Sequence, residues 1–328
     1  MDSNTPSVQI PTRTQSPRPS KTMDPSFPAY PQAITINPSH SHQQTFIILH
    51  GRGSFAEKFA PPLLHMTTTE GKTLQTAFPH AKLIFPTASR TRATIYKKSF
   101  THQWFDCWHL DACTKRHDLM REGLGRSCAY VHFLLQREME IVGARNVVLW
   151  GMSQGCATGL AAVVTWEGEP FAGMVGMCGW LPFGNLVEEM VGGGGWGARD
   201  GDGDYADEDP FARSDDEDED APYARSDEED SSEKKACIDS RARGVEFFRE
   251  EIDMQDKEGM VFRKIPIFLG HGTEDEKVSM ELGREAERVL GLLGADVEMK
   301  EYVKLGHWYS EAMFDDIFRF LKQKLNIS

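Results

Sequence analysis

The stretch VVLWGMSQGCATGLAA, residues 147–162, limits the possible folds more than any other part of the sequence. Four apolar residues lead into a Gly-x-Ser-x-Gly motif at 151–155, and small residues follow it at once. An apolar run of this kind is typical of a strand buried in a parallel sheet, and the small residues suit a helix that packs closely behind the turn. Two interpretations follow: a structural turn that happens to contain Ser153, or a nucleophile held on a strained strand-to-helix bend.

Strands and helices alternate along most of the chain. Apolar runs predict strands, and apolar residues at helical spacing predict helices. The predicted strands are 45–50, 81–86, 147–151, 171–180, 264–270 and 296–303, and the predicted helices are 119–142, 276–294 and 310–325. This alternation predicts an α/β fold, with a mostly parallel central sheet and helices on both faces.

Two segments do not fit this alternation. Residues 1–42 are rich in Ser, Thr, Pro and Gln and lack hydrophobic periodicity, so we expect a disordered tail. Residues at about 190–242 combine a glycine run with a long acidic tract, which we expect to be a disordered insertion. The chain resumes as a helix around 243–260. We therefore predict one domain over 43–328, interrupted by that insertion.

The negative charge is concentrated in the insertion. Residues 200–233 hold 17 of the 50 acidic residues and two of the 36 basic residues, so this segment carries −15 and the rest of the chain +1. A nearly neutral body offers no basic footprint for nucleic acid. No stretch reaches the roughly 18 apolar residues that a membrane span needs, so we expect at most peripheral membrane contact. The N-terminus has no apolar core behind a positive end, so we expect no secretory signal.

The six cysteines show no metal-like CxxC spacing, and we expect free thiols in a reducing compartment. These features predict a cytoplasmic protein, with the nucleus as a second location.

If Ser153 is a nucleophile, it needs a base and an acid that orients the base. Only His271 and His307 lie downstream. His307 follows the last predicted strand, where a base at the carboxyl edge of the sheet should lie, whereas His271 begins the loop that must carry the acid. We therefore predict His307 as the base and a structural role for His271. The acid is Asp275 or Glu274, and loop position alone does not separate them.

An oxyanion hole needs backbone N–H donors. We expect one from Gln154, directly after the nucleophile, and one from Arg52 in the segment LHGRGS. The alternative is a glycine-rich turn without a role. Trp104, Trp180 and Leu181 are candidates to line a substrate groove, although aromatic residues beside strands are also typical of a core.

Five motifs in order resemble the acyl-protein thioesterase, or phospholipase/carboxylesterase, family of α/β-hydrolases. They are FIILHGRGS (46–54), HQWFDCW (102–108), GMSQGCA (151–157), MCGWLP (177–182) and FLGHGTEDEKV (268–278). The resemblance implies an α/β-hydrolase fold, a catalytic set of Ser153, Asp275 and His307, and no metal or organic cofactor. It also implies hydrolysis of acyl thioesters or esters, with an acylated protein or a small ester as the substrate.

The chain departs from the family pattern near the expected site. Arg52 stands where the family often has leucine, Cys178 replaces a serine, and the loop 88–102 carries four basic residues. Two alternatives remain at this level. One is a small-molecule carboxylesterase or lysophospholipase that uses the same catalytic residues, and the other is a catalytically idle binding protein that uses its acidic tract. Acyl-chain length and oligomeric state are left open.

Overall fold

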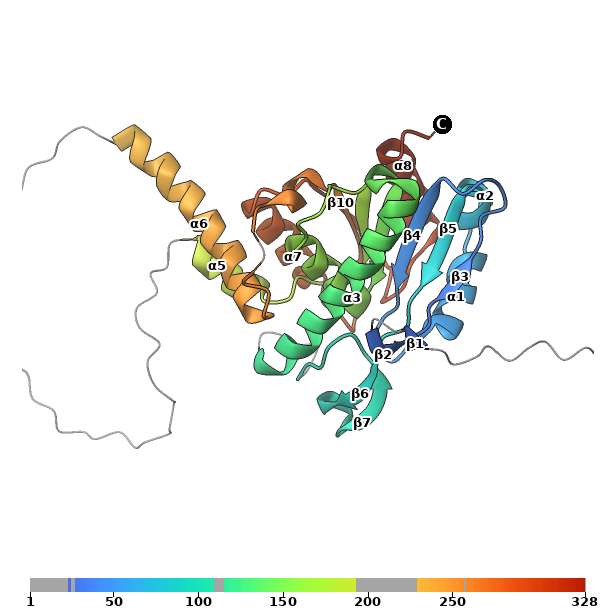
Figure 1. Ribbon diagram of the computed structural model, residues 1–328, viewed down its shortest axis with the longest axis horizontal. Coiled ribbons are helices and arrows are strands. Elements are labelled where there is room, and N and C mark those ends of the chain that lie inside the picture. The colour runs from blue at the N-terminus through green and yellow to red at the C-terminus, as the bar shows by residue number, and fades with distance from the viewer. Residues whose placement is uncertain (1–22, 25–26, 109–114, 193–228, 257, 328) are drawn as a thin grey trace, which may run out of the picture.

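The computed structural model describes residues 23–24, 27–108, 115–192, 229–256 and 258–327. Their main feature is a seven-stranded sheet with helices on both faces (Figure 1). In spatial order its strands are β11 (Val297–Tyr302), β10 (Ile267–Gly272), β9 (Gly173–Met177), β8 (Val147–Met152), β4 (Gln44–Leu49), β5 (Ala81–Phe85) and β3 (Ile34–Ile36). Neighbouring strands are parallel except for β3, which runs antiparallel to β5 at the edge. The predicted α/β-hydrolase architecture is confirmed.

The sheet is buried on both faces because its apolar residues alternate between two cores. Ile47 and Leu49 of β4 pack into one hydrophobic cluster, and Phe46 and Ile48 pack into the other. All residues of β4, β8, β9 and β10 are buried. Continuous apolar runs are the expected signature of such strands, which explains why these strands could be found in the sequence.

Each core is closed by its own set of helices. One face is covered by α3 (Asp118–Val142), α4 (Gln154–Val164), α5 (Gly184–Val191), α6 (Glu229–Glu251) and α7 (Met280–Leu292), and the other by α1 (Ala56–His65), α2 (Leu74–Ala77) and α8 (Glu311–Lys324). Short 3₁₀ turns lie at η1 (Thr94–Tyr96), η2 (Ala144–Asn146) and η3 (Val261–Lys264). None of the described helices combines the length and the apolar character needed to cross a bilayer.

The folded domain begins before residue 43, where the sequence placed its start. β1 (Met23–Asp24) pairs with β2 (Phe27–Pro31), and β3 joins the main sheet. Tyr30 is buried, its ring stacks on Tyr130 at 4.1 Å, and its hydroxyl lies 3.0 Å from Ser127 Oγ. The expected tail over 1–42 is therefore too long, because a few apolar side chains in a proline-rich stretch suffice to fix an edge strand. Residues 1–22 lie outside the described residues.

The expected insertion at 190–242 is also corrected at its C-terminal boundary. α6 begins at Glu229, inside that segment, and residues 193–228 lie outside the described part of the chain. Val245, Phe248 and Ile252 are fully buried in the core at spacings of three and four residues. This apolar stripe anchors the helix, which confirms the helix expected around 243–260.

The loops that contain the predicted site residues lie at the carboxyl edge of the parallel sheet. A two-stranded hairpin, β6 (Arg90–Ala93) and β7 (Ser99–His102), lies beyond this edge (Figure 1). β4, β8, β10 and β11 all end here, and each is followed by a loop or turn with a predicted site residue. Ligands of open α/β sheets bind in the crevice outside these strand ends.

Candidate active site

Ser153 lies between the end of β8 and the start of α4, with φ 55° and ψ −121°. An L-residue in this region is strained, and such strain gathers at functional sites. The bend is held because the Ser153 N–H donates to the Met177 carbonyl at 2.8 Å and the Ser153 carbonyl accepts from the Ala157 N–H at 3.0 Å. Ser153 therefore lies at the edge of the sheet on a strained turn that these two hydrogen bonds hold in place.

The glycines on both sides of Ser153 are required by close backbone approach. A Cβ at Gly151 would lie 2.3 Å from the Gly155 carbonyl oxygen, and a Cβ at Gly155 would lie 2.5 Å from the Leu49 carbonyl oxygen. Heavy atoms cannot approach so closely, so the turn and the helix after it depend on glycine at both positions. This is the packing expected of a nucleophile elbow.

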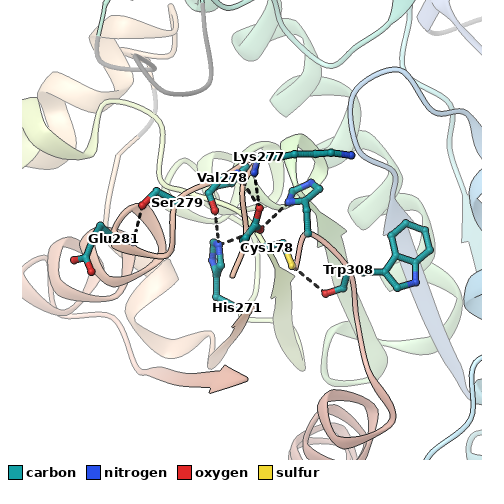
Figure 2. A network of polar contacts seen from close by, with 9 residues as sticks. Cys178, His271, Lys277, Val278, Ser279, Glu281 and Trp308 are labelled. Carbon is teal, nitrogen blue, oxygen red and sulfur yellow. Dashed lines mark hydrogen bonds and ion pairs between the residues drawn. The ribbon is translucent and has the colours of Figure 1, made fainter. Parts of the chain in front are cut away.

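Asp275 follows β10 and gathers four hydrogen-bond donors. Its Oδ1 accepts from the N–H groups of Lys277 and Val278, each at 2.9 Å. Its Oδ2 lies 2.7 Å from His307 Nδ1 and 3.3 Å from His271 Nε2. Figure 2 shows His271 and Val278 on one side of this network and Lys277 and Trp308 on the other. Asp275 is buried, whereas its neighbour Glu274 is exposed, so the structure brings only one of the two candidate acids to the imidazole.

The carboxylate form of Asp275 is the stable one. Burial by itself would raise the pKa of Asp275, but hydrogen bonds from His271, His307 and the Val278 N–H hold that pKa below its usual range. An ionised Asp275 keeps the proton of the imidazole on Nδ1 of His307 and leaves Nε2 able to accept a second proton.

Ser153 and His307 line the same cleft, which has a volume of about 320 Å³. Its lining is Gly51, Arg52, Gly53, Ser54, Lys58, Phe59, Pro62, Tyr96, Met152, Ser153, Gln154, Trp180, Lys277, His307 and Trp308. Within the described residues, no hydrogen bond joins the Ser153 hydroxyl to Nε2 of His307. Catalytic hydrogen bonds of unliganded sites are often this loose and tighten in the complex.

Two backbone N–H groups of residues that line the cleft have no hydrogen-bond partner among the described residues. Neither the N–H of Arg52 nor that of Gln154 donates to any residue in the described ranges. The Arg52 loop is set by His50, whose Nδ1 donates to the Gly51 carbonyl at 2.7 Å and whose Nε2 accepts from the Ala88 N–H at 3.0 Å. Burial lowers the pKa of His50 to about 4, so the ring is neutral and this pattern is fixed.

The three predicted groove residues separate. Trp180 lines the cleft, whereas Trp104 and Leu181 belong to the hydrophobic core and are absent from the lining. Trp104 instead holds two neighbours of the site in place. Its indole Nε1 donates to the His50 carbonyl at 2.7 Å, and its backbone N–H donates to Gln154 Oε1 at 3.0 Å. Direct substrate contact by Trp104 or Leu181 stays a prediction that this geometry does not favour.

Sequence reasoning did not find several residues of the cleft. Lys58 and Phe59 belong to α1, Tyr96 to η1, and Trp308 follows His307. Trp308, an aromatic residue directly after the predicted base, was a sequence signal that could have been used. Lys58 and Phe59 gave none, because they are adjacent to no motif.

One group of potential metal ligands occurs among the described residues: Cys178, Asp275 and His307. Their donor atoms already have partners, since Asp275 binds the imidazole and the Cys178 thiol donates to the Trp308 carbonyl at 3.3 Å. Burial raises the pKa of the Cys178 thiol to about 12, so the thiolate that a metal would need is disfavoured. This trio does not fit a metal, and the expectation of a metal-free and cofactor-free reaction stays a prediction.

A model of the phospholipase/carboxylesterase family matches residues 31–191 and 247–325. The chain belongs to this family. The two matched pieces leave out residues 192–246, from the end of α5 to the last part of α6, so nearly all of the expected insertion lies outside the family pattern.

Relatives within the family are moderately similar. The acyl-protein thioesterase 1 of Schizosaccharomyces pombe is 31% identical over 46% of this chain and 62% of its own length. The acyl-protein thioesterase 1 of Gibberella zeae is 24% identical over 87% of this chain and 92% of its own length. The crystal structure of Arabidopsis thaliana SOBER1 has a TM-score of 0.56 at 20% identity and covers 86% of this chain and 99% of that one, which shows a shared fold. The stretch aligned with the Schizosaccharomyces pombe protein spans 62% of that protein's length.

Proposed function

We propose that this protein is a serine hydrolase of acyl thioesters and carboxylic esters, of the acyl-protein thioesterase type. One observation carries the proposal: a serine on a strained elbow and an Asp275–His307 pair, from loops far apart in sequence, open into one cleft. Membership of a phospholipase/carboxylesterase family and the names of its relatives support the same reaction class.

In the proposed reaction, His307 Nε2 takes the proton of Ser153 as the hydroxyl oxygen attacks the substrate carbonyl. Asp275 orients the imidazole and stabilises its positive form. The N–H groups of Arg52 and Gln154 donate to the oxyanion, and each such donor contributes about 3 to 4 kcal/mol to lowering the barrier. The imidazolium returns the proton to the leaving thiol or alcohol, and water then releases the acid by the same steps.

Labelling with a fluorophosphonate probe tests the nucleophile. The wild type should be labelled and Ser153→Ala should not, while both proteins have the same circular dichroism spectrum. Labelling that persists in Ser153→Ala would remove Ser153 from the mechanism. Absence of labelling in both would favour the alternative of a catalytically idle binding protein.

Turnover of matched substrates tests the finer assignment. An acyl-protein thioesterase should release palmitate from an S-palmitoylated peptide, whereas a small-molecule carboxylesterase should turn over short aryl esters and leave the peptide intact. The relatives' names favour the first outcome. The departures near the cleft, Arg52 and Cys178, make the comparison informative.

We also propose a cytoplasmic location. It is supported by the four cysteines whose side chains are described, Cys107, Cys128, Cys156 and Cys178, all of which are buried and free. Fractionation of cells that express the tagged full chain tests it, and recovery of the protein in the medium would contradict it.

A further inference from the structure

The cleft around Ser153 has an unbalanced charge. Among the described residues, three basic side chains line it, those of Arg52, Lys58 and Lys277, and no aspartate or glutamate does. Glu57 and Glu276 are neighbours of two of these cations in the sequence, but neither belongs to the lining. A cleft lined by charges of one sign attracts ligands of the opposite sign.

Among the described residues these three cations also lack ion-pair partners, whereas several other basic residues have one. Arg121 pairs with Glu251, Arg284 with Glu301, and Arg288 with Glu188. Within the described ranges, Arg52, Lys58 and Lys277 make no ion pair. Their charges are therefore not cancelled by neighbouring carboxylates and remain able to interact with a ligand.

Arg52 is held at the cleft by neutral groups. Its Nη1 donates to Cys107 Sγ at 2.7 Å, and its guanidinium lies 5.6 Å from the centre of the Tyr96 ring. Burial raises the pKa of the Cys107 thiol, so the sulfur stays protonated and does not offset the guanidinium charge. The contacts restrict the side chain without neutralising it, as a preformed anion-binding group requires.

Lys277 is linked to the proposed catalytic acid through its backbone. Its N–H donates to Asp275 Oδ1, which fixes the backbone, and its side chain is exposed. Figure 2 shows this side chain extending away from His271 and Val278, on the side of the network where Trp308 lies. Lys58 is also exposed and reaches the cleft from α1.

The remainder of the lining is largely apolar. Phe59, Pro62, Met152 and Trp180 offer contact to a hydrocarbon segment, and Tyr96 and Trp308 add exposed aromatic rings. A ligand that fits both features has an apolar segment at the reacting carbonyl and a negative group a short distance from it.

We propose that the cleft selects esters or thioesters bearing a carboxylate or phosphate group, which Arg52, Lys58 and Lys277 bind while the carbonyl lies at Ser153. This inference rests on the function proposed above and names the substrate class of the same site. The anionic group could belong to the acyl part or to the leaving group, and the two sources are separable by experiment.

Two pairs of substrates of matched size serve as probes. For the acyl side, mono-p-nitrophenyl glutarate is compared with p-nitrophenyl valerate. For the leaving group, the S-butyryl thioester of 3-mercaptopropionate is compared with that of 3-mercaptopropionamide. The measured quantity is the kcat/KM of the anionic substrate divided by that of its neutral partner. Each kcat/KM is first divided by the rate constant for hydrolysis of the same substrate by hydroxide. We expect a ratio of about 10 in at least one pair at low salt, falling toward one at about 0.5 M salt, because screening weakens exposed charge interactions.

Variants of the full chain identify the groups responsible. Lys58→Gln with Lys277→Gln should lower the ratio several-fold, Arg52→Gln should lower it further, and Arg52→Lys should retain most of it. The matched control is Arg145→Gln, an exposed cation before the amino end of β8 and thus at the opposite edge of the sheet, which should not change the ratio.

Ratios of one or less in both pairs would overturn the inference, as would ratios that these variants do not change. Ser153-dependent turnover of the neutral esters in that situation would leave the proposed hydrolase function standing. Absence of Ser153-dependent turnover for every ester would instead refute the proposed function, and the inference with it.

Discussion

At the candidate site, backbone strain is found at one residue, and the residues around it provide the hydrogen bonds that hold it. Ser153 carries the strained backbone, and its neighbours supply the contacts that hold it. The sequence predicted this residue because glycines at 151 and 155 are needed for the turn. It could not predict that His271, placed as structural, would lie 3.3 Å from Asp275, because that contact depends on the course of the loop between them.

The strain at Ser153 has a measurable cost. Ser153→Gly should stabilise the fold relative to Ser153→Ala by about 1 to 2 kcal/mol, because glycine adopts positive φ without the clash of a Cβ. Chemical denaturation of the two variants measures the difference, and alanine serves as the control for loss of the hydroxyl. Equal stabilities would mean that the turn is not strained.

Asp275→Asn should reduce kcat by about 10⁴-fold, because an amide no longer fixes the imidazole with its proton on Nδ1.

The stability of the fold should also depend on pH through Asp275. The pKa of Asp275 is lower in the folded protein than in the unfolded chain, so its carboxylate stabilises the fold above the unfolded pKa of about 3.9 and less as the pH falls below it.

The stability difference between wild type and Asp275→Asn should accordingly be constant near neutral pH and shrink below pH of about 4. Denaturation curves collected along a pH series measure it. A difference that grows on acidification would contradict the assigned hydrogen bonds to the carboxylate.

At the scale of elements, buried strands and amphipathic helices were predictable and edge features were not. The apolar runs of β4, β8 and β10 are each fully buried, so their composition directly reported their place. The β6–β7 hairpin was missed because its strands are short and largely exposed, and because two of the four residues of β6 are arginines. The start of α6 was missed because the sequence from Glu229 is polar and charged, and the apolar residues Val245 and Phe248 come much later.

The β8–α4 turn depends on the smallest side chain at one position of the helix. Gly155→Ala should destabilise the protein by about 1 to 3 kcal/mol, because its Cβ would press on the carbonyl oxygens of Leu49 and His50. Gly291→Ala in α7 is the control: nothing lies within 4 Å of its added Cβ, so it should stabilise by about 0.5 to 1 kcal/mol. Thermal unfolding of both variants compares them, and a neutral Gly155→Ala would show that the turn can open.

At the scale of the whole molecule, the acidic tract and the predicted site residues are separate in sequence. The fold class followed from the alternation of elements. The extent of the domain did not, because β3 and α6 are fixed by tertiary contacts that local composition does not reveal. The family match skips the tract, and both matched pieces contribute to the candidate site.

Replacing residues 195–226 by a flexible Gly-Ser linker should therefore change kcat/KM for a neutral ester by no more than about two-fold, because the described residues that line the cleft lie outside this range and a change of chain length between two fixed ends has a small free-energy effect. The replacement leaves Val245 and Phe248 of α6 in place to pack against the core. Steady-state kinetics on the wild type and the replacement tests this, and a loss of ten-fold or more would show that the tract contributes to turnover.

The most direct test asks whether Ser153, His307 and Asp275 act as one unit. The measurement is kcat for a short acyl thioester in Ser153→Ala, in His307→Ala and in the triple variant with Asp275→Ala. If the three form a catalytic unit, Ser153→Ala, His307→Ala and the triple variant should fall to nearly the same residual rate, since removal of one member already abolishes the shared step. Losses that multiply from single to triple variant, or substantial turnover by Ser153→Ala, would contradict the proposed mechanism.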